Sequence, residues 1–538
     1  MATLQKYQFP SIKSQTILKF QFRMNTPPPN KERLGARGIG FWSFGNWKLF
    51  GICLPAGRQG IWILEFFHHD GYLFQQRCER KLFEMIQKLK EIVGSDNFTD
   101  QLEELVPYSY DASMNVHRPD AAVWPESTEQ VLAIVKFANE HKIPVIPRGA
   151  GTSLSGGVVP IKGGIIIDLC KMNKLLEVSI ENRYARVEAG VVCDTLNREL
   201  AKHGFIFPPD PASSSVATIG GNVATNAGGI KGAKYGTTRD YVLGLQVVLP
   251  TGELMRTGSY TMKSVSGYDL AKLFIGAEGT LGIITEVTLK INPLPRHAMT
   301  AVATYARLED AGNAIFQTMT SGVLPSVMEI MDKVTIQSIK ENTDIALPDA
   351  EAMILTETDG FTWEEVEAQM EVVLSILKKN HPIEIKTAKD EKERLSLWKA
   401  RKSAYATLAR VSPSFTLDDV TVPISHIPEL LVGIQEISKK HNIVVATFGH
   451  AGDGNLHPQI LFDEYDADQV ARTKKVEEEI FRLAIRLNGT LSGEHGIGLS
   501  KAAYMDLEHD PVEMALMRRI KKTMDPNNIM NPGKRALD

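Results

Sequence analysis

The chain carries two histidines, His450 and His457, on either side of a Gly-Asp-Gly-Asn turn. The apolar runs 444–448 and 458–462 beside this turn predict two strands, and an Asp-Gly between apolar runs is a strong hairpin signal. Side chains that face each other across such a hairpin have Cβ atoms roughly 5 Å apart. The pattern therefore predicts that both imidazoles can bind one ion.

A carboxylate ligand for the same ion is available from Glu494. Two imidazoles and one carboxylate leave a divalent ion with open coordination positions, which is typical of a catalytic site. His495 follows Glu494 and can serve as a base. Neighbouring side chains of a regular strand point to opposite faces, but Gly493 and Gly496 allow an irregular turn here. The alternative interpretation is that all these groups are polar residues of surface loops.

A glycine-rich loop at 148–157 suits a phosphate-containing ligand. It follows an apolar strand at 143–147 and supplies many unobstructed backbone N–H groups. Its glycines do not have the G-x-G-x-x-G spacing of a Rossmann fold, and it lacks the Gly-Lys-Ser/Thr of a P-loop. Taken alone, it is equally compatible with an ordinary tight connection. Its candidate binding residues are Arg148, Gly149, Ala150, Gly151, Thr152, Ser153, Gly156 and Gly157.

Two further segments consist mostly of small residues. The segment 208–229 begins with Pro-Pro-Asp-Pro and makes a poor core element, but a good surface for a flat ring and a dinucleotide. The segment 276–285 is again rich in glycine and runs into a strand. The candidate cofactor-binding residues in these segments are Pro209, Asp210, Ser214, Gly220, Gly221, Asn222, Thr225, Asn226, Gly228, Glu278, Gly279, Gly282 and Ile283.

The elements that must position these residues form two domains after an atypical leader. We expect the leader, 1–84, to lie outside the functional fold, because neither helical nor strand periodicity persists there. Residues 85–292 form the first domain, and from Arg118 onward it alternates short strands, helices and long loops. Ser127 caps a helix predicted at 129–141. Residues 293–538 form the second domain. Its predicted helices are 363–379, 392–408 and 468–487.

Composition excludes several classes of protein. A chain of 538 residues is too long for one ordinary core. Its formal net charge of −4 gives no basic excess for nucleic acid, and no apolar run is long enough to span a bilayer. The four cysteines (Cys53, Cys78, Cys170 and Cys193) have no CxxC spacing. The sequence therefore encodes no iron–sulfur cluster or zinc ribbon, and it indicates a reducing compartment.

In combination, the motifs resemble those of the vanillyl-alcohol oxidase/p-cresol methylhydroxylase family of FAD-binding oxidoreductases. They are most similar to the branch of FAD-dependent D-lactate dehydrogenases and glycolate oxidase flavin subunits, and the resemblance covers 85–534. It implies an α+β fold, with a two-lobed PCMH-type FAD-binding domain followed by an α+β cap domain of the FAD-linked oxidase C-terminal type. It also implies that the loop 148–157 holds the FAD pyrophosphate and that the two small-residue segments enclose the adenosine and the isoalloxazine.

The resemblance also implies roles at the catalytic centre. His450, His457 and Glu494 would bind a divalent metal, zinc or manganese, and His495 would act as the base. Arg401 lies where the family places the arginine that binds the substrate carboxylate. The alternative for Arg401 is a place on a charged helix face.

The implied reaction is the FAD- and metal-dependent oxidation of a small D-2-hydroxy acid to the 2-oxo acid. Relatives that use dicarboxylates carry a lysine in the segment that is 414–420 here, and this segment has none. We therefore expect D-lactate or glycolate as substrate, with a D-2-hydroxyglutarate dehydrogenase as the alternative. Thr152 replaces the histidine that binds FAD covalently in some relatives, which implies non-covalent FAD.

Reduced FAD must pass its electrons to another molecule. Because the sequence has no nicotinamide fingerprint and no cysteine cluster, we expect a quinone, a cytochrome, an electron-transfer flavoprotein or an iron–sulfur subunit. A homodimer and a hetero-complex both fit. The expected location is the cytoplasm, with peripheral contact at the inner membrane face as an option.

Three other functions are compatible with parts of the sequence. A non-catalytic flavin subunit of an electron-transfer complex and an ether-lipid synthase-like enzyme would not need the two-histidine hairpin with Glu494-His495. A flavin-free metal hydrolase would not need the cofactor loops. Hydroxy-acid oxidation is the function that uses all of these motifs.

Overall fold

The computed structural model describes residues 19–22, 39–44, 47–54, 61–68 and 84–538. The chain divides into two compact units, Met1–Leu89 and Lys90–Asp538. The first unit contains a four-stranded antiparallel sheet in the order β1-β4-β3-β2. Its strands are β1 (Lys19–Phe22), β2 (Ile39–Phe44), β3 (Trp47–Leu54) and β4 (Ile61–His68).

This sheet differs from the expectation that no strand periodicity persists in the leader. The strand β4 reads Ile-Trp-Ile-Leu-Glu-Phe-Phe-His, so that apolar residues occupy consecutive positions instead of alternating. The signal for these strands is therefore their content of aromatic and β-branched residues, which favour strands. That residues 1–84 lie outside the functional fold stays a prediction.

The second unit begins with a small α/β lobe whose sheet has the order β5-β6-β8-β7. The strands β6, β8 and β7 are parallel, and β5 pairs antiparallel with β6. The side chain of Ser127 accepts a hydrogen bond from the Gln130 N–H at the start of α3, which confirms the predicted cap. The elements are β5 (Phe98–Thr99), α2 (Leu102–Leu105), β6 (Ala121–Val123), α3 (Thr128–His141), β7 (Val145–Arg148) and β8 (Ile165–Asp168).

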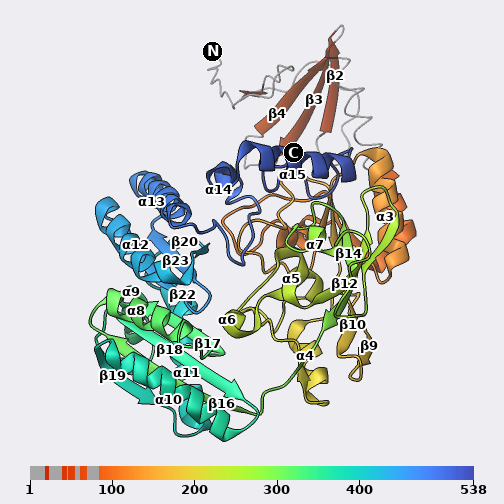
Figure 1. Ribbon diagram of the computed structural model, residues 1–538. Helices are drawn as coiled ribbons and strands as arrows, with labels where there is room; N and C mark the ends of the chain where they lie inside the picture. Colours follow the sequence, from red (N-terminus) through yellow and green to blue (C-terminus); the bar gives the residue numbers. More distant parts are fainter. Residues whose placement is uncertain (1–18, 23–38, 45–46, 55–60, 69–83) are drawn as a thin grey trace. The chain divides into compact units, whose positions relative to one another are not determined.

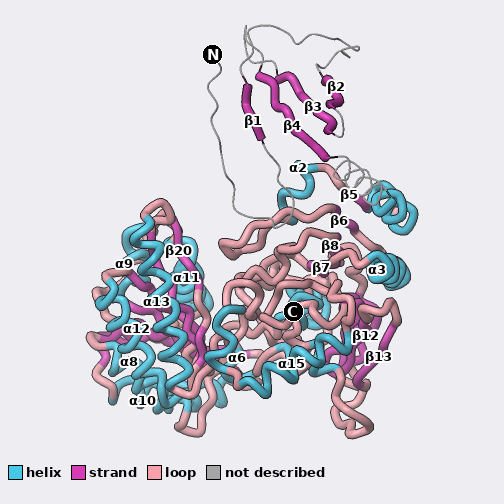
Figure 2. Tube along the Cα trace, turned by 90° about the horizontal axis from the view of Figure 1, so that it is seen from above, coloured by secondary structure: helices cyan, strands magenta, loops and turns pink. Residues whose placement is uncertain are grey.

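A second lobe contains a five-stranded antiparallel sheet in the order β13-β12-β14-β10-β9, and β11 pairs with β15 beside it. Two lobes are therefore present as predicted, and loops make up much of the chain around β7 and β8 (Figure 2). The elements are β9 (Leu175–Ser179), β10 (Tyr184–Glu188), α4 (Cys193–Ala201), β11 (Phe205–Ile206), α5 (Ile219–Thr225), α6 (Gly232–Tyr235), β12 (Val242–Val248), β13 (Leu254–Gly258), α7 (Ala271–Phe274), β14 (Ile283–Lys290) and β15 (Asn292–Pro293).

The next part of the chain is built on an eight-stranded antiparallel sheet with the order β19-β16-β18-β17-β22-β23-β20, in which β21 also pairs with β23. The predicted two-histidine hairpin is present as β22 and β23. The strands are β16 (His297–Tyr305), β17 (Val327–Asp332), β18 (Ala352–Gly360), β19 (Pro382–Thr387), β20 (Ser414–Leu417), β21 (Val420–Thr421), β22 (Val444–His450) and β23 (Asn455–Phe462).

Helices cover both faces of this sheet (Figure 1). Four of them bury apolar side chains in a core with Met328 and Ile330 of β17, whereas α9 and α11 pack on the opposite face with Val327 and Met331. The predicted helices at 363–379, 392–408 and 468–487 correspond to α10, α11 and α13. The helices are α8 (Leu308–Met319), α9 (Lys333–Asn342), α10 (Trp363–Lys379), α11 (Glu391–Leu408), α12 (Ile427–His441) and α13 (Ala467–Arg486).

The C-terminal segment leaves the large sheet and returns to the first two lobes. It contains α14 (Met505–Glu508) and α15 (Pro511–Met524), and Met530 forms a bridge with Val145 of β7. The side-chain amide of Asn531 donates hydrogen bonds to the backbone carbonyls of Gly157 and Glu278. Among the described residues, no helix is long and apolar enough to cross a membrane.

Candidate active site

The structure brings together the three side chains for which the sequence predicts a shared ion. His450 ends β22, His457 lies in β23 and Glu494 follows α13, and their ligand atoms all lie within 4.8 Å of one another. The Nε2 atoms of His450 and His457 are 3.1 and 3.5 Å from the same oxygen, Oε1 of Glu494. Two imidazole nitrogens and a carboxylate oxygen thus converge, which is a donor set that zinc and manganese both accept.

The two histidines share one face of the hairpin, but they are not direct cross-strand partners. In the register of β22 and β23, His450 pairs with Asn455 and His457 pairs with Phe448. The reason is that residues 451–454 form the turn, which places the two histidines diagonally. Their ring centroids are 5.0 Å apart and the ring planes are at 84°. This arrangement directs both Nε2 atoms toward Glu494.

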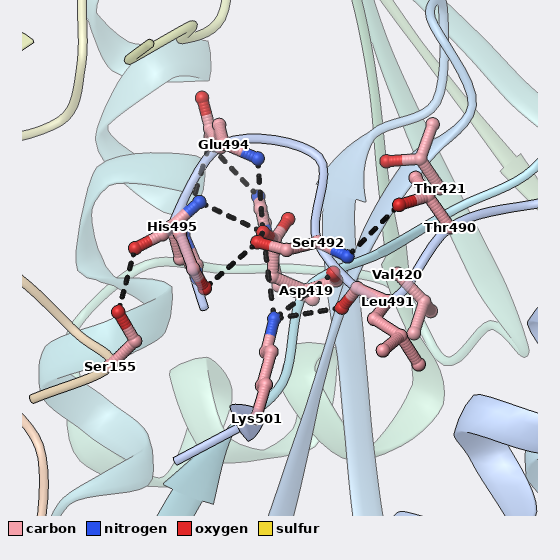
Figure 3. A network of polar contacts seen from close by, with 12 residues as sticks. Ser155, Asp419, Val420, Thr421, Thr490, Leu491, Ser492, Glu494, His495 and Lys501 are labelled. Atoms are coloured by element: carbon pink, nitrogen blue, oxygen red, sulfur yellow. Dashed lines mark hydrogen bonds and ion pairs between the residues drawn. The ribbon is translucent and has the colours of Figure 1, made fainter. Parts of the chain in front are cut away.

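The neighbours Glu494 and His495 both reach the site because the backbone around them is irregular. Residues 493–495 form a bend instead of a strand, as the flanking glycines allow. The carboxylate of Asp419 accepts hydrogen bonds from the N–H groups of Glu494 and His495, at 3.0 and 2.9 Å (Figure 3). Asp419 is fully buried, and the Lys501 ammonium lies 3.7 Å from its carboxylate.

His495 lines the cavity beside the two candidate metal-binding histidines. Its ring stacks on that of His457, with centroids 4.8 Å apart and an interplanar angle of 12°. Its Nε2 is 3.8 Å from the Glu494 carboxylate, and its Nδ1 has no hydrogen-bond partner among the described residues. Burial lowers the pKa of His495. A neutral imidazole with a free nitrogen can accept a proton.

Arg401 projects from α11 into the same space. Its Nε donates a hydrogen bond of 2.5 Å to Glu329, and its guanidinium lies 4.6 Å from the centre of the Phe448 ring. Glu329 is a buried residue of β17 that also accepts a hydrogen bond of 2.6 Å from Nδ1 of His450. The sequence interpretation did not single out Glu329 or Asp419.

A cavity of about 1260 Å³ connects this group of side chains with the glycine-rich loops. It has the size and the mostly apolar wall of a cofactor site. Arg401, His450, His457, Glu494 and His495 line one part of it. The predicted cofactor residues that line it are Arg148, Gly149, Ala150, Gly151, Thr152, Ser153, Gly157, Asp210, Ser214, Gly220, Gly221, Asn222, Thr225, Glu278, Gly279 and Gly282.

Five predicted cofactor residues do not line the cavity: Gly156, Pro209, Asn226, Gly228 and Ile283. Asn226 ends α5 in the left-handed conformation, and its side-chain oxygen accepts a hydrogen bond from the Arg239 N–H, so that it shapes the backbone. Gly228 makes room for Glu494, because a Cβ at this position would lie 2.7 Å from the Glu494 carboxylate. Ile283 is a core residue of β14.

The glycine loop has the shape that a pyrophosphate needs. Gly151 has φ +73°, and a Cβ there would lie 2.1 Å from the guanidinium of Arg148. Arg148 in turn donates hydrogen bonds to the backbone carbonyls of Tyr110 and Pro107, which hold its side chain in place beside the loop. Small residues leave the loop's backbone open to the cavity, and these residues therefore fit FAD.

Carboxyl groups dominate the electrostatics around the two histidines. Burial raises the pKa of Asp453 to about 7 and that of Asp210 to about 6. Burial opposes protonation of His450, but the adjacent carboxylates of Glu329 and Glu494 outweigh it and raise the pKa of His450. The site thus offers carboxylate oxygens beside two imidazole nitrogens, which are ligands that a divalent cation accepts.

Both halves of the second unit match known protein families. Residues 119–258 match the FAD binding domain family, and residues 294–535 match the C-terminal domain of FAD linked oxidases. The chain is 41% identical to glycolate oxidase subunit GlcD of Bacillus subtilis (strain 168) over 450 residues, which cover 83% of this chain and 96% of that protein. The chain belongs to the FAD-linked oxidases.

One further relative and one solved structure are similar to this FAD-linked oxidase. It is 36% identical to the mitochondrial D-lactate dehydrogenase [cytochrome] of Arabidopsis thaliana, over 84% of this chain and 80% of that protein. Its fold is similar to that of p-cresol methylhydroxylase with substrate bound, with a TM-score of 0.71 at 21% identity, over 85% of this chain and 97% of that chain. The predicted fold and the FAD cofactor are thereby confirmed.

Proposed function

We propose that this FAD-linked oxidase oxidises a small D-2-hydroxy acid, D-lactate or glycolate, to the 2-oxo acid with the help of a divalent metal ion. The observation that carries the proposal is the convergence of His450, His457 and Glu494 beside a cavity that Arg401 and the FAD loops also line. The named relatives, a glycolate oxidase subunit and a D-lactate dehydrogenase, support the same substrate class.

Each residue of the group has a task suited to its position. Bound FAD supplies the hydride acceptor, and a bound divalent ion lowers the pKa of a coordinated hydroxyl. His450, His457 and Glu494 would hold the ion, and Arg401 would bind the substrate carboxylate through its free Nη groups. His495, whose ring lines the cavity and whose Nε2 lies 3.8 Å from the Glu494 carboxylate, would accept the proton of the substrate hydroxyl.

The cavity-lining residue of the segment 414–420 supports a substrate with one carboxylate. The segment 414–420 has no lysine, and its cavity-lining residue is Leu417. An apolar side chain at this place gives no partner for a second carboxylate, which would then have to pair with a cation elsewhere in the cavity wall, such as Lys402. D-2-Hydroxyglutarate is therefore the less favoured substrate.

The electrons of reduced FAD leave through a partner other than a nicotinamide. The glycolate oxidase relatives are named as subunits, which supports a hetero-complex for this chain as well. A quinone, a cytochrome, an electron-transfer flavoprotein and an iron–sulfur subunit are the candidate acceptors. Residues 85–292 and 293–538 are the proposed FAD-binding and cap domains.

The test is an anaerobic titration of the purified full-length protein, followed by its visible spectrum. We expect D-lactate or glycolate to bleach the flavin bands, whereas L-lactate and D-2-hydroxyglutarate should not. Removal of metal with a chelator should abolish bleaching, and added zinc or manganese should restore it. A flavin spectrum that no D-2-hydroxy acid bleaches, with or without metal, would contradict the proposed function and leave the family assignment intact.

A further inference from the structure

A buried carboxylate lies between the candidate metal site and the candidate substrate arginine. Glu329 is in β17, whose register pairs Ile330 with Gly449 of β22, so that Glu329 lies beside His450. Its Oε1 accepts a hydrogen bond of 2.6 Å from Nδ1 of His450, and its Oε2 accepts one of 2.5 Å from Nε of Arg401. One side chain thus contacts both functional groups.

Core packing does not explain a glutamate at this position. The residues on either side of it on the same face of β17, Val327 and Met331, are apolar and fully buried, and Glu329 is itself fully buried. A buried ion pair adds little stability compared with apolar residues of the same volume. An acidic side chain here therefore points to a task in the site.

Hydrogen bonding to Glu329 determines which nitrogen of His450 faces the site. An ionised carboxylate can only accept hydrogen bonds, so that Nδ1 of His450 must carry the proton that lies between them. Without an ion, Nε2 is hydrogen-bonded to the Glu494 carboxylate at 3.1 Å and carries a proton as well. A bound ion would replace the Nε2 proton, so that the lone pair on Nε2 faces the ion while Nδ1 keeps its proton on Glu329. A carboxylate behind a histidine ligand orients the ring and increases its affinity for metal.

The same carboxylate determines how Arg401 is presented. Glu329 occupies Nε, and the two Nη groups have no hydrogen-bond partner among the described residues. The terminal face of the guanidinium is therefore free for a carboxylate in the cavity. A 2-hydroxy acid carries its hydroxyl and its carboxylate on adjacent carbons, so that the ion and the arginine must be held at a set separation.

We propose that Glu329 is a positioning residue that sets the place of His450 relative to Arg401, and so matches the site to a 2-hydroxy acid. This inference rests on the proposed function. It predicts that one substitution, Glu329→Gln, weakens both metal binding and substrate binding. A glutamine can accept from only one of the two donors, and its amide N–H₂ would face the other.

The experiment measures zinc binding by isothermal titration calorimetry on full-length, FAD-loaded protein stripped with a chelator. We expect one zinc per wild-type chain and at least tenfold weaker binding in E329Q, the range for loss of a carboxylate behind a histidine ligand. The KM for the substrate acid should also rise at least tenfold. R401K should raise KM and leave the zinc Kd unchanged, which separates the two effects.

Glu357 gives a matched control. It is a buried, cavity-lining carboxylate of the neighbouring strand β18, and it accepts hydrogen bonds from Arg394 and Trp398 instead of His450. E357Q should keep the zinc Kd within twofold of wild type. If E329Q loses FAD on purification, E329D gives the same test. Its carboxylate keeps the charge, but it lies one methylene farther from His450 and Arg401.

The outcomes are distinguishable from failure of the proposed function. Wild-type zinc affinity in E329Q or E329D, with an unchanged KM, would overturn the role of Glu329 and leave the proposed function standing. Absence of zinc and manganese binding in the wild type would overturn both. If E357Q weakens zinc binding as much as E329Q does, the effect comes from the loss of any buried charge near the cavity. That result would also overturn the role of Glu329.

Discussion

Glu329 and Asp419 are acidic residues that hold other residues of the site in place through hydrogen bonds. Neither belongs to a recognisable sequence motif. The histidines, Glu494 and Arg401 could be predicted because a ligand type at a characteristic spacing has a chemical meaning. Glu329 lies between apolar residues of β17, more than a hundred residues before His450, and an acidic residue in a strand is usually exposed. Only the pairing of β17 with β22 reveals its partner.

At the same scale, Thr152 predicts how the flavin is attached. This residue lines the cavity. The family resemblance implies that covalently flavinylated relatives have a histidine at this position. A threonine hydroxyl does not form that bond, so that all FAD should be released by acid precipitation and appear in the supernatant. The measurement is the flavin absorbance of supernatant and pellet. A yellow pellet, or a fluorescent band after denaturing electrophoresis, would contradict the prediction.

At the scale of elements, long helices were the most predictable part of the fold. The helices α10, α11 and α13 begin after Thr362, Asp390 and Asp466, whose side chains accept hydrogen bonds from the first turn. These cap residues and the apolar periodicity mark the same boundaries. The register of the two-histidine hairpin could not be predicted, because it depends on how many residues the turn takes up.

The cap of α9 gives a prediction about pH. Burial raises the pKa of its cap residue, Asp332, from 3.8 to about 6. Because the folded state holds this proton more tightly than the unfolded state, the stabilisation is present below pH 4 and is lost as the pH rises through 6. The isosteric substitution D332N removes the titrating group and keeps a side-chain oxygen for the cap.

Relative to D332N, the wild type should therefore gain on the order of 1 to 2 kcal/mol of unfolding free energy between pH 7 and pH 4.5. Urea unfolding of both proteins, followed by circular dichroism at several pH values, measures this difference. A difference that stays constant across the range would show that Asp332 titrates near its ordinary pKa.

At the scale of the whole molecule, the division into two units indicates which part of the chain the activity requires. Residues 1–89 form one unit and the remainder another, and the matched family domains begin at residue 119. The sequence predicts the functional fold from Met85 onward, because orderly periodicity begins there. It does not predict the sheet of the first unit, whose two longest strands, β3 and β4, lack strict alternation.

A protein that begins at Met85 should therefore bind FAD and zinc as the full chain does. The ratio of flavin to protein absorbance and the zinc stoichiometry of both proteins test this prediction, with the full-length chain purified in parallel as the control. A shortened protein that is insoluble or colourless would assign residues 1–84 a part in the fold.

The contact of Asn531 with Gly157 joins positions that are 374 residues apart in the chain. During synthesis, the glycine loop leaves the ribosome long before the residue that ties it down. The FAD-binding loops are therefore held together only after the entire large sheet has been synthesised, so that FAD binding follows translation. We expect chains that end before residue 531 to be purified without flavin colour, because Asn531 no longer holds the loops of Gly157 and Glu278 together.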